Sequence, residues 1–83
     1  MILNLTQHAA TAEQIAAGVV DLSPELRTQL QALLTFEALP TAREVDQRAE
    51  QIALLAAPLE ADQAMIGGAP FLMARLEAAL SDH

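Results

Sequence analysis

The stretch AMIGGAPFLM, residues 64–73, combines the signals of a buried strand, a glycine turn and a helix. Gly67 and Gly68 permit a tight turn after the apolar residues, and Pro70 suits the first turn of a helix. These signals predict a strand at Gln63–Ile66 and a helix that begins close to Pro70. The stretch is therefore predicted to be a strand-to-helix junction, the repeating unit of α/β folds.

The beginning of the chain shows the same order of signals. Ile2–Leu5 is a short apolar run with β-compatible residues. Asn4 interrupts this run, so one face of the strand is expected to be polar or the amide to be paired. A polar segment follows, and a helix start is predicted at Thr11. Two such junctions indicate an α/β layer fold with parallel strands, in which ligands usually sit beyond the carboxyl ends of the strands.

Capping signals predict three helix starts, including the one at Thr11. Thr11–Gln14 is a capping box that starts a short helix, and Gly18 suits the left-handed end of that helix. Ser23-Pro24-Glu25 begins a second helix, and Thr41–Glu44 is a second capping box that begins a third. Val19–Leu22 is either a short extended segment or a connector that packs its apolar side chains inward.

Apolar stripes predict which faces of the longer helices are buried. Residues three or four apart along a helix share a face, so these side chains are expected to point at one core. The predicted core positions are Leu26, Leu30, Leu33 and Leu34 in the second helix, Val45, Ala49, Ile52, Ala53 and Ala56 in the third, and Leu72, Leu76, Ala79 and Leu80 in the last.

These elements predict one small domain, residues 1–83, of the α/β class. We expect a Rossmann-like unit with two parallel strands joined by a mostly helical crossover. The alternative is an all-α helical bundle, because most of the chain has helical caps and periodicity. A third strand would normally follow the last helix. The chain is therefore expected either to lack a C-terminal strand or to have its sheet edge covered by a second copy or another protein.

Composition disfavours several function classes. The net charge is −7, with eleven acidic residues against four arginines and no lysine, so nucleic-acid binding is not expected. The chain has no cysteine for a disulfide or a thiolate zinc site, and its acids lack the spacing of a calcium loop. The lack of cysteine is consistent with a cytoplasmic location, which is expected here. The N-terminus does not have the pattern of a signal peptide, and no apolar run is long enough for a membrane span. No cofactor or metal is predicted.

Two loops supply the candidate site. Gly67 and Gly68 could cradle an anion at the start of a helix, or they serve only the turn. Thr6, Gln7 and His8 follow the first strand and would lie beside these glycines if the two strands are parallel neighbours. His8 could then act as an acid or base. The alternative is that Gln7 and His8 cap loose backbone groups.

Several separated motifs cover the whole chain: ILNLTQHAAT at 2–11, GVVDL at 18–22, LTF at 34–36, LPT at 39–41 and AMIGGAPFLM at 64–73. Together they resemble a family of small proteins from phages and prophages of proteobacteria, for which no activity is established. Members of that family continue past the helix that matches residues 70–82 into another strand and an arginine-containing tail. The resemblance therefore implies a phage or prophage protein, acting in the bacterial host cell, with a strand beyond the last helix.

Two functions follow from these observations. The first is an accessory protein that binds a host or phage protein through an uncovered sheet edge or an apolar helix face. The same edge would also favour self-association, most simply as a homodimer. The second is a small Rossmann-like protein or enzyme that binds a nucleotide or another anion at the Gly67–Gly68 turn. The sequence contains no catalytic constellation that favours an enzyme.

Overall fold

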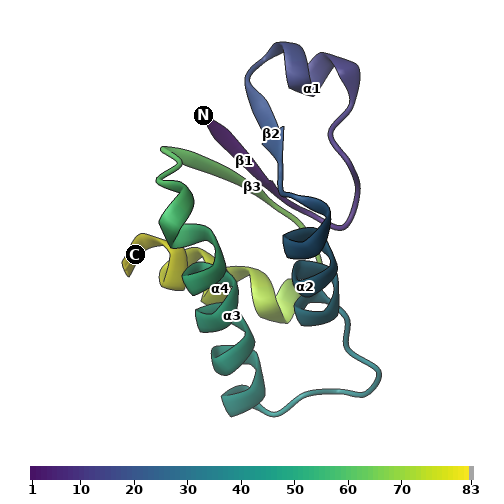
Figure 1. Ribbon diagram of the computed structural model, residues 1–83. Coiled ribbons are helices and arrows are strands. Elements are labelled where there is room, and N and C mark those ends of the chain that lie inside the picture. Colours follow the sequence, from purple (N-terminus) through teal and green to yellow (C-terminus); the bar gives the residue numbers. More distant parts are fainter. Residues whose placement is uncertain (83) are drawn as a thin grey trace.

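Three parallel strands form the sheet of the computed structural model, which describes residues 1–82 of the 83-residue chain (Figure 1). β1 spans Ile2–Leu5, β2 spans Val19–Asp21 and β3 spans Gln63–Ile66. The strand order is β2-β1-β3, and Leu3 of β1 lies opposite Ala64 of β3. β1 is thus the centre of the sheet, and both of its neighbours run parallel to it.

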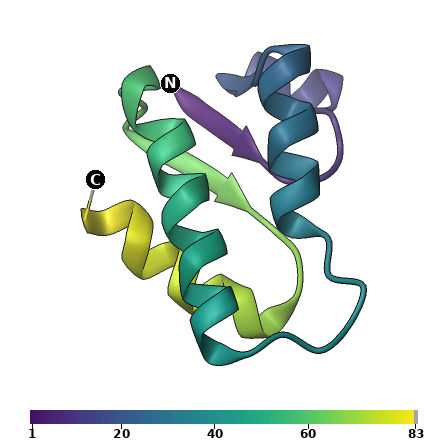
Figure 2. The same cartoon turned by 60° about the horizontal axis from the view of Figure 1, so that its bottom comes forward.

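The helices cover the two faces of the sheet unequally. α1 spans Ala12–Ala16, α2 spans Pro24–Leu34, α3 spans Ala42–Ala56 and α4 spans Pro70–Asp82, and a short 3₁₀ helix, Ala57–Leu59, follows α3. The short α1 lies on one face, whereas α2, α3 and α4 lie together on the other (Figures 1 and 2). The main core is therefore on the side of the three long helices.

The structure confirms the predicted α/β class. The strands predicted at Ile2–Leu5 and Gln63–Ile66 are adjacent and parallel, and a helical crossover joins them. A three-stranded sheet excludes the alternative of an all-α helical bundle within the described residues 1–82.

The prediction of a two-stranded sheet is wrong. The segment Val19–Leu22 was predicted to be either extended or a connector, and its first three residues, Val19–Asp21, form β2, which pairs with β1. Gly18 allows β2 to reach β1, because its φ of +101° turns the chain sharply between α1 and β2. The Gly18 carbonyl also accepts a hydrogen bond from the Ile2 amide at 3.1 Å. A strand of three residues is too short to show an alternating pattern in the sequence. Only its pairing with β1 shows that it is a strand.

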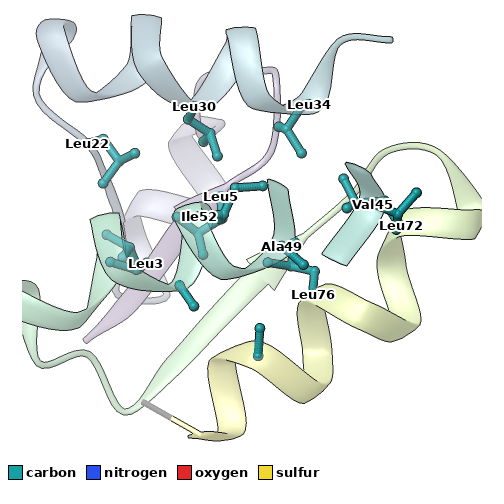
Figure 3. Close-up of a cluster of buried hydrophobic side chains, with 13 residues drawn as sticks. Leu3, Leu5, Leu22, Leu30, Leu34, Val45, Ala49, Ile52, Leu72 and Leu76 are labelled. Atoms are coloured by element: carbon teal, nitrogen blue, oxygen red, sulfur yellow. The ribbon is translucent and has the colours of Figure 1, made fainter. Parts of the chain in front are cut away.

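The core is aliphatic and agrees with the predicted stripes (Figure 3). Leu3 and Leu5 of β1 face it, because they alternate with Asn4 along the strand. Leu5 and Ile52 are fully buried, and Leu30 is only 1% exposed. The predicted inward positions of α3 are all buried, namely Val45, Ala49, Ile52, Ala53 and Ala56.

The two predicted capping boxes have different outcomes. At α1 both bonds form: the Gln14 amide donates to the Thr11 hydroxyl, and the Thr11 amide donates to the Gln14 side chain. At α3 only the Thr41 hydroxyl cap forms, at 3.1 Å from the Glu44 amide. The Glu44 carboxylate instead pairs with Arg48 at 3.0 Å, one turn further along the helix. A charged partner within reach is the stronger attraction for a carboxylate.

Arg48 joins the end of α2 to α3. Its guanidinium donates to the carbonyls of Ala32 and Leu33, at 3.2 and 3.3 Å, and to the carbonyl of Thr35. These carbonyls lie at the end of α2, where they have no partners within the helix. The same guanidinium lies 4.2 Å from the centre of the Phe36 ring, a cation–π distance. One side chain thereby caps α2 and fixes the start of the loop to α3.

Candidate functional site

The connections of β1 and β3 create a crevice at the carboxyl edge of the sheet. The chain leaves β1 toward α1 on one face, whereas it leaves β3 toward α4 on the other face (Figure 1). Because the two loops diverge from neighbouring parallel strands, the space between them stays open. In open α/β sheets this topological switch point is the usual place for a ligand.

All of the predicted site residues line one cleft at this edge. Thr6, Gln7 and His8 come from the loop after β1, and Gly67 and Gly68 come from the turn after β3. The cleft has a volume of about 520 Å³ and is open to solvent. This volume is within the range of about 300–1,000 Å³ that is usual for small-molecule sites. The parallel pairing of β1 and β3 brings together two segments about sixty residues apart in the sequence.

Four further residues line the cleft and were not predicted as site residues. Ala9 belongs to the loop after β1, Thr11 and Gln14 belong to the capping box of α1, and Met65 lies in β3. Thr11 and Gln14 could have been predicted from their capping box, because it places the first turn of α1 directly after the polar segment that lines the cleft. Met65 could be found only from the strand register, which sets it opposite Asn4.

A buried polar network holds the loop after β1 in place. Asn4 is only 4% exposed, and its Nδ2 donates to Asp21 Oδ1 at 2.8 Å and to the His8 carbonyl at 2.7 Å. Its Oδ1 lies 3.0 Å from the Thr6 amide, which donates to it, and 2.7 Å from the Thr6 hydroxyl. The interruption of the apolar strand by Asn4 is thus explained by a fully paired amide, as expected.

Asp21 completes this network from β2. Its carboxylate accepts from the Ala10 amide at 3.1 Å as well as from Asn4. The hydrogen bond from Asn4, followed by that from Ala10 and by the charge of Arg27, lowers the pKa of Asp21, and partial burial opposes this shift. Asp21 thereby ties β2 to the loop that lines the cleft. Within the described residues it forms no pair with His8.

Backbone capping in this loop is done mainly by Asn4 and Thr6. The Thr6 hydroxyl lies within hydrogen-bond distance of the His8 carbonyl and amide, at 3.1 and 3.4 Å. The Gln7 carbonyl accepts from the Gln31 side chain at 3.4 Å. Among residues 1–82, the Gln7 amide group and the His8 imidazole make no hydrogen bond. These two exposed side chains are therefore available to a ligand.

The two glycines differ in what they require. Gly68 has a φ of +151°, and a Cβ there would lie 3.4 Å from Met73 Cε and 3.7 Å from Leu34 Cδ2. The turn itself therefore needs glycine at position 68. Gly67 has no positive φ, and a Cβ there would meet Thr6 Cγ2 at 3.5 Å, an ordinary contact. The lack of a side chain at Gly67 is thus not demanded by the backbone.

The described part of the chain offers little for metal chemistry. No group of three or more His, Cys, Asp or Glu side chains within residues 1–82 is arranged to hold a metal ion.

None of the helices described in these residues has both the length and the apolar character needed to cross a membrane.

The fold and the cleft define a small, doubly wound α/β protein with three parallel strands. No protein-family model, curated protein or solved structure matches the chain.

Proposed function

We propose that this chain is a small ligand-binding protein that holds a nucleotide-class ligand in the cleft at the carboxyl edge of its sheet. The observation that carries this proposal is the convergence of Thr6, Gln7, His8, Gly67 and Gly68 on one cleft at the switch point between β1 and β3. Side chains with free hydrogen-bonding groups meet there beside a glycine turn. This is the arrangement that small-molecule sites in open α/β sheets share.

Binding in this cleft accounts for two features of the loop after β1. The Asn4 network fixes the loop backbone, while Gln7 and His8 remain exposed. A fixed backbone with free side chains costs little entropy on binding, because only the side chains become ordered. The lack of a conformational reason for glycine at Gly67 also fits a position where a ligand approaches the backbone.

The test is a thermal-shift screen of the purified chain against nucleosides, nucleotides and inorganic phosphate, followed by ¹H–¹⁵N spectra. A ligand at 100 times its Kd should stabilise the fold by about 2.7 kcal/mol, which shifts the Tm of so small a domain by about 10 °C or more. The amides of the loop after β1 and of the glycine turn should shift most. If no compound raises the Tm and no cleft amide shifts, the proposal fails.

A matched pair of variants makes the location explicit. Ala9 lines the cleft and is exposed, so Ala9→Phe should fill part of the cleft without disturbing the core. Ala78 is exposed on α4 and does not line the cleft, so Ala78→Phe is the control. Ala9→Phe should abolish the ligand-induced shift, and Ala78→Phe should preserve it. Equal effects of the two variants would place the binding elsewhere.

A second candidate function is the binding of a protein partner, as expected of a phage or prophage accessory protein. It is favoured by β3, which is one of the two outer strands of the sheet in residues 1–82 and has Gln63 and Ala64 exposed. Unpaired backbone groups at such an edge can accept a further strand, supplied by a second copy, another protein or a longer form of this chain. Sedimentation velocity at micromolar concentration tests the homodimer. If the chain is a monomer and its β3 amide resonances do not shift when host extract is added, this candidate function is wrong.

A further inference from the structure

The lining of the cleft contains no carboxylate, arginine or lysine. Its side chains are amides, hydroxyls, an imidazole, a thioether and a methyl group. The chain as a whole has a net charge of −7. A phosphate group in this cleft would therefore meet no arginine or lysine side chain, and the negative charge of the whole chain would oppose its binding.

Three side-chain groups of the cleft remain free to bind. They are the Gln7 amide, the His8 imidazole and Nε2 of Gln14, since Gln14 uses only its Oε1 to cap Thr11, and none of the three is hydrogen-bonded within residues 1–82. A glutamine amide offers a donor and an acceptor in one plane. That pattern matches the edge of an adenine ring, which presents an amino donor next to a ring-nitrogen acceptor.

The apolar part of the cleft suits the face of a ring. Met65 and Ala9 supply a thioether and a methyl group, and the thioether of methionine makes favourable contacts with aromatic rings. Gly67 and Gly68 present backbone without a side chain, so a flat group can approach them closely. The cleft thus combines apolar surface with hydrogen-bonding amide, hydroxyl and imidazole groups.

We infer that the cleft recognises the uncharged ring of an adenine-type nucleoside, and that any phosphate of the ligand lies outside it. This inference rests on the proposed function and narrows it, because it assigns the binding energy to the base and not to the phosphate. It replaces the expectation, drawn from the glycine turn alone, that an anion is cradled there. The source of the ring is either a free nucleoside or a nucleotide whose phosphates extend into solvent.

Titrations with adenosine, AMP and inorganic phosphate, followed by ¹H–¹⁵N spectra, test the inference. Adenosine should shift the cleft amides, AMP should bind no more tightly than adenosine, and phosphate should displace neither. Raising the salt concentration should leave the adenosine Kd nearly unchanged, because no ion pair is involved. If AMP binds more than about ten-fold more tightly than adenosine, or if phosphate competes, the ring is not the recognised group, since ten-fold corresponds to about 1.4 kcal/mol.

Isosteric variants locate the recognition. Gln14→Glu keeps the oxygen that caps Thr11 but removes the free Nε2 donor, and Gln7→Glu removes a donor in the same way. Each should raise the adenosine Kd by about ten-fold or more, as expected for a lost base contact. Gln47→Glu, on the exposed face of α3, adds the same charge and should change the Kd less than two-fold.

The possible failures are distinguishable. If adenosine does not bind but another compound of the screen shifts the cleft amides, the inference is overturned and the proposed function stands. If nothing shifts these amides, both fail together. Loss of binding in all three glutamine variants would show that added negative charge, and not the removed donor, weakens the complex, and this outcome also overturns the inference.

Discussion

Nδ2 of Asn4 lies 2.8 Å from Oδ1 of Asp21, so a buried amide joins β1 to β2 at the carboxyl end of the sheet. The same nitrogen donates to the His8 carbonyl, and the Asn4 oxygen accepts from the Thr6 amide. One residue thus fixes a strand pair and the first part of the loop that lines the cleft. Its replacement should affect both the stability of the fold and the shape of the cleft.

Asn4→Ala should lower the free energy of unfolding by about 1–3 kcal/mol, because it leaves buried partners unsatisfied. Urea denaturation measures this loss. Gln29→Ala, an exposed position in the middle of α2, is the control and should stay within about 0.5 kcal/mol of the parent chain. A loss for Asn4→Ala as small as that of the control would mean that water replaces the amide without cost.

Asp21 should make the stability depend on pH in a definite direction. Because its folded-state pKa is lowered, its carboxylate stabilises the fold fully above the unfolded value of about 3.9. This contribution is lost as the pH falls through the folded-state pKa. The stability difference between the parent chain and Asp21→Asn should therefore be constant above about pH 5 and shrink as the pH falls below about 4. Urea melts across this pH range measure it, and a difference that grows toward acid pH would contradict the assignment.

Leu30→Ala and Ile52→Ala should each destabilise the fold by about 2–5 kcal/mol, as expected when a large buried side chain is truncated. Leu30 is 1% exposed and Ile52 is fully buried. Leu54, which is 53% exposed on the same helix as Ile52, provides the control, and Leu54→Ala should have little effect. Chemical denaturation separates these cases. Equal, small losses at all three positions would mean that the helices do not pack on the sheet in solution.

The two glycines of the turn should respond differently to alanine. Gly68→Ala should cost about 1–3 kcal/mol, because its φ of +151° is strained for any residue with a Cβ. Gly67→Ala should change the stability by less than about 1 kcal/mol but should weaken ligand binding, since it adds a methyl group to the cleft. Thermal melts with and without ligand measure both effects. If Gly67→Ala binds like the parent chain, the ligand does not approach the backbone at Gly67.

Local signals predicted most of the helices and two of the strands. Thr11, Ser23 and Thr41 each cap the helix that they were expected to begin, because a helix start is decided by a few neighbouring residues. β2 could not be decided in the same way. Its three residues form a strand because β1 lies beside them, and that neighbour is distant in the sequence.

Only the part of the candidate site that depends on the pairing of β1 and β3 could be predicted from the sequence. Parallel pairing of β1 and β3 was enough to bring Thr6 and Gly67 together. The role of Asp21 was not predictable, because its partners depend on the place of β2 in the sheet. Asp21 binds Asn4 and the Ala10 amide, and neither of these is its neighbour in the sequence.

The aromatic residues give this protein a natural spectroscopic marker. Phe36 and Phe71 are its only aromatic rings apart from the histidines, and they pack edge to face with their centres 5.0 Å apart. In this arrangement the edge protons of one ring lie over the face of the other and are shifted upfield in a proton NMR spectrum. No tyrosine or tryptophan signal overlaps them. Because Phe71 lies in the first turn of α4 and Phe36 lies just after α2, these few resonances report on the packing of α4 against that loop without any label.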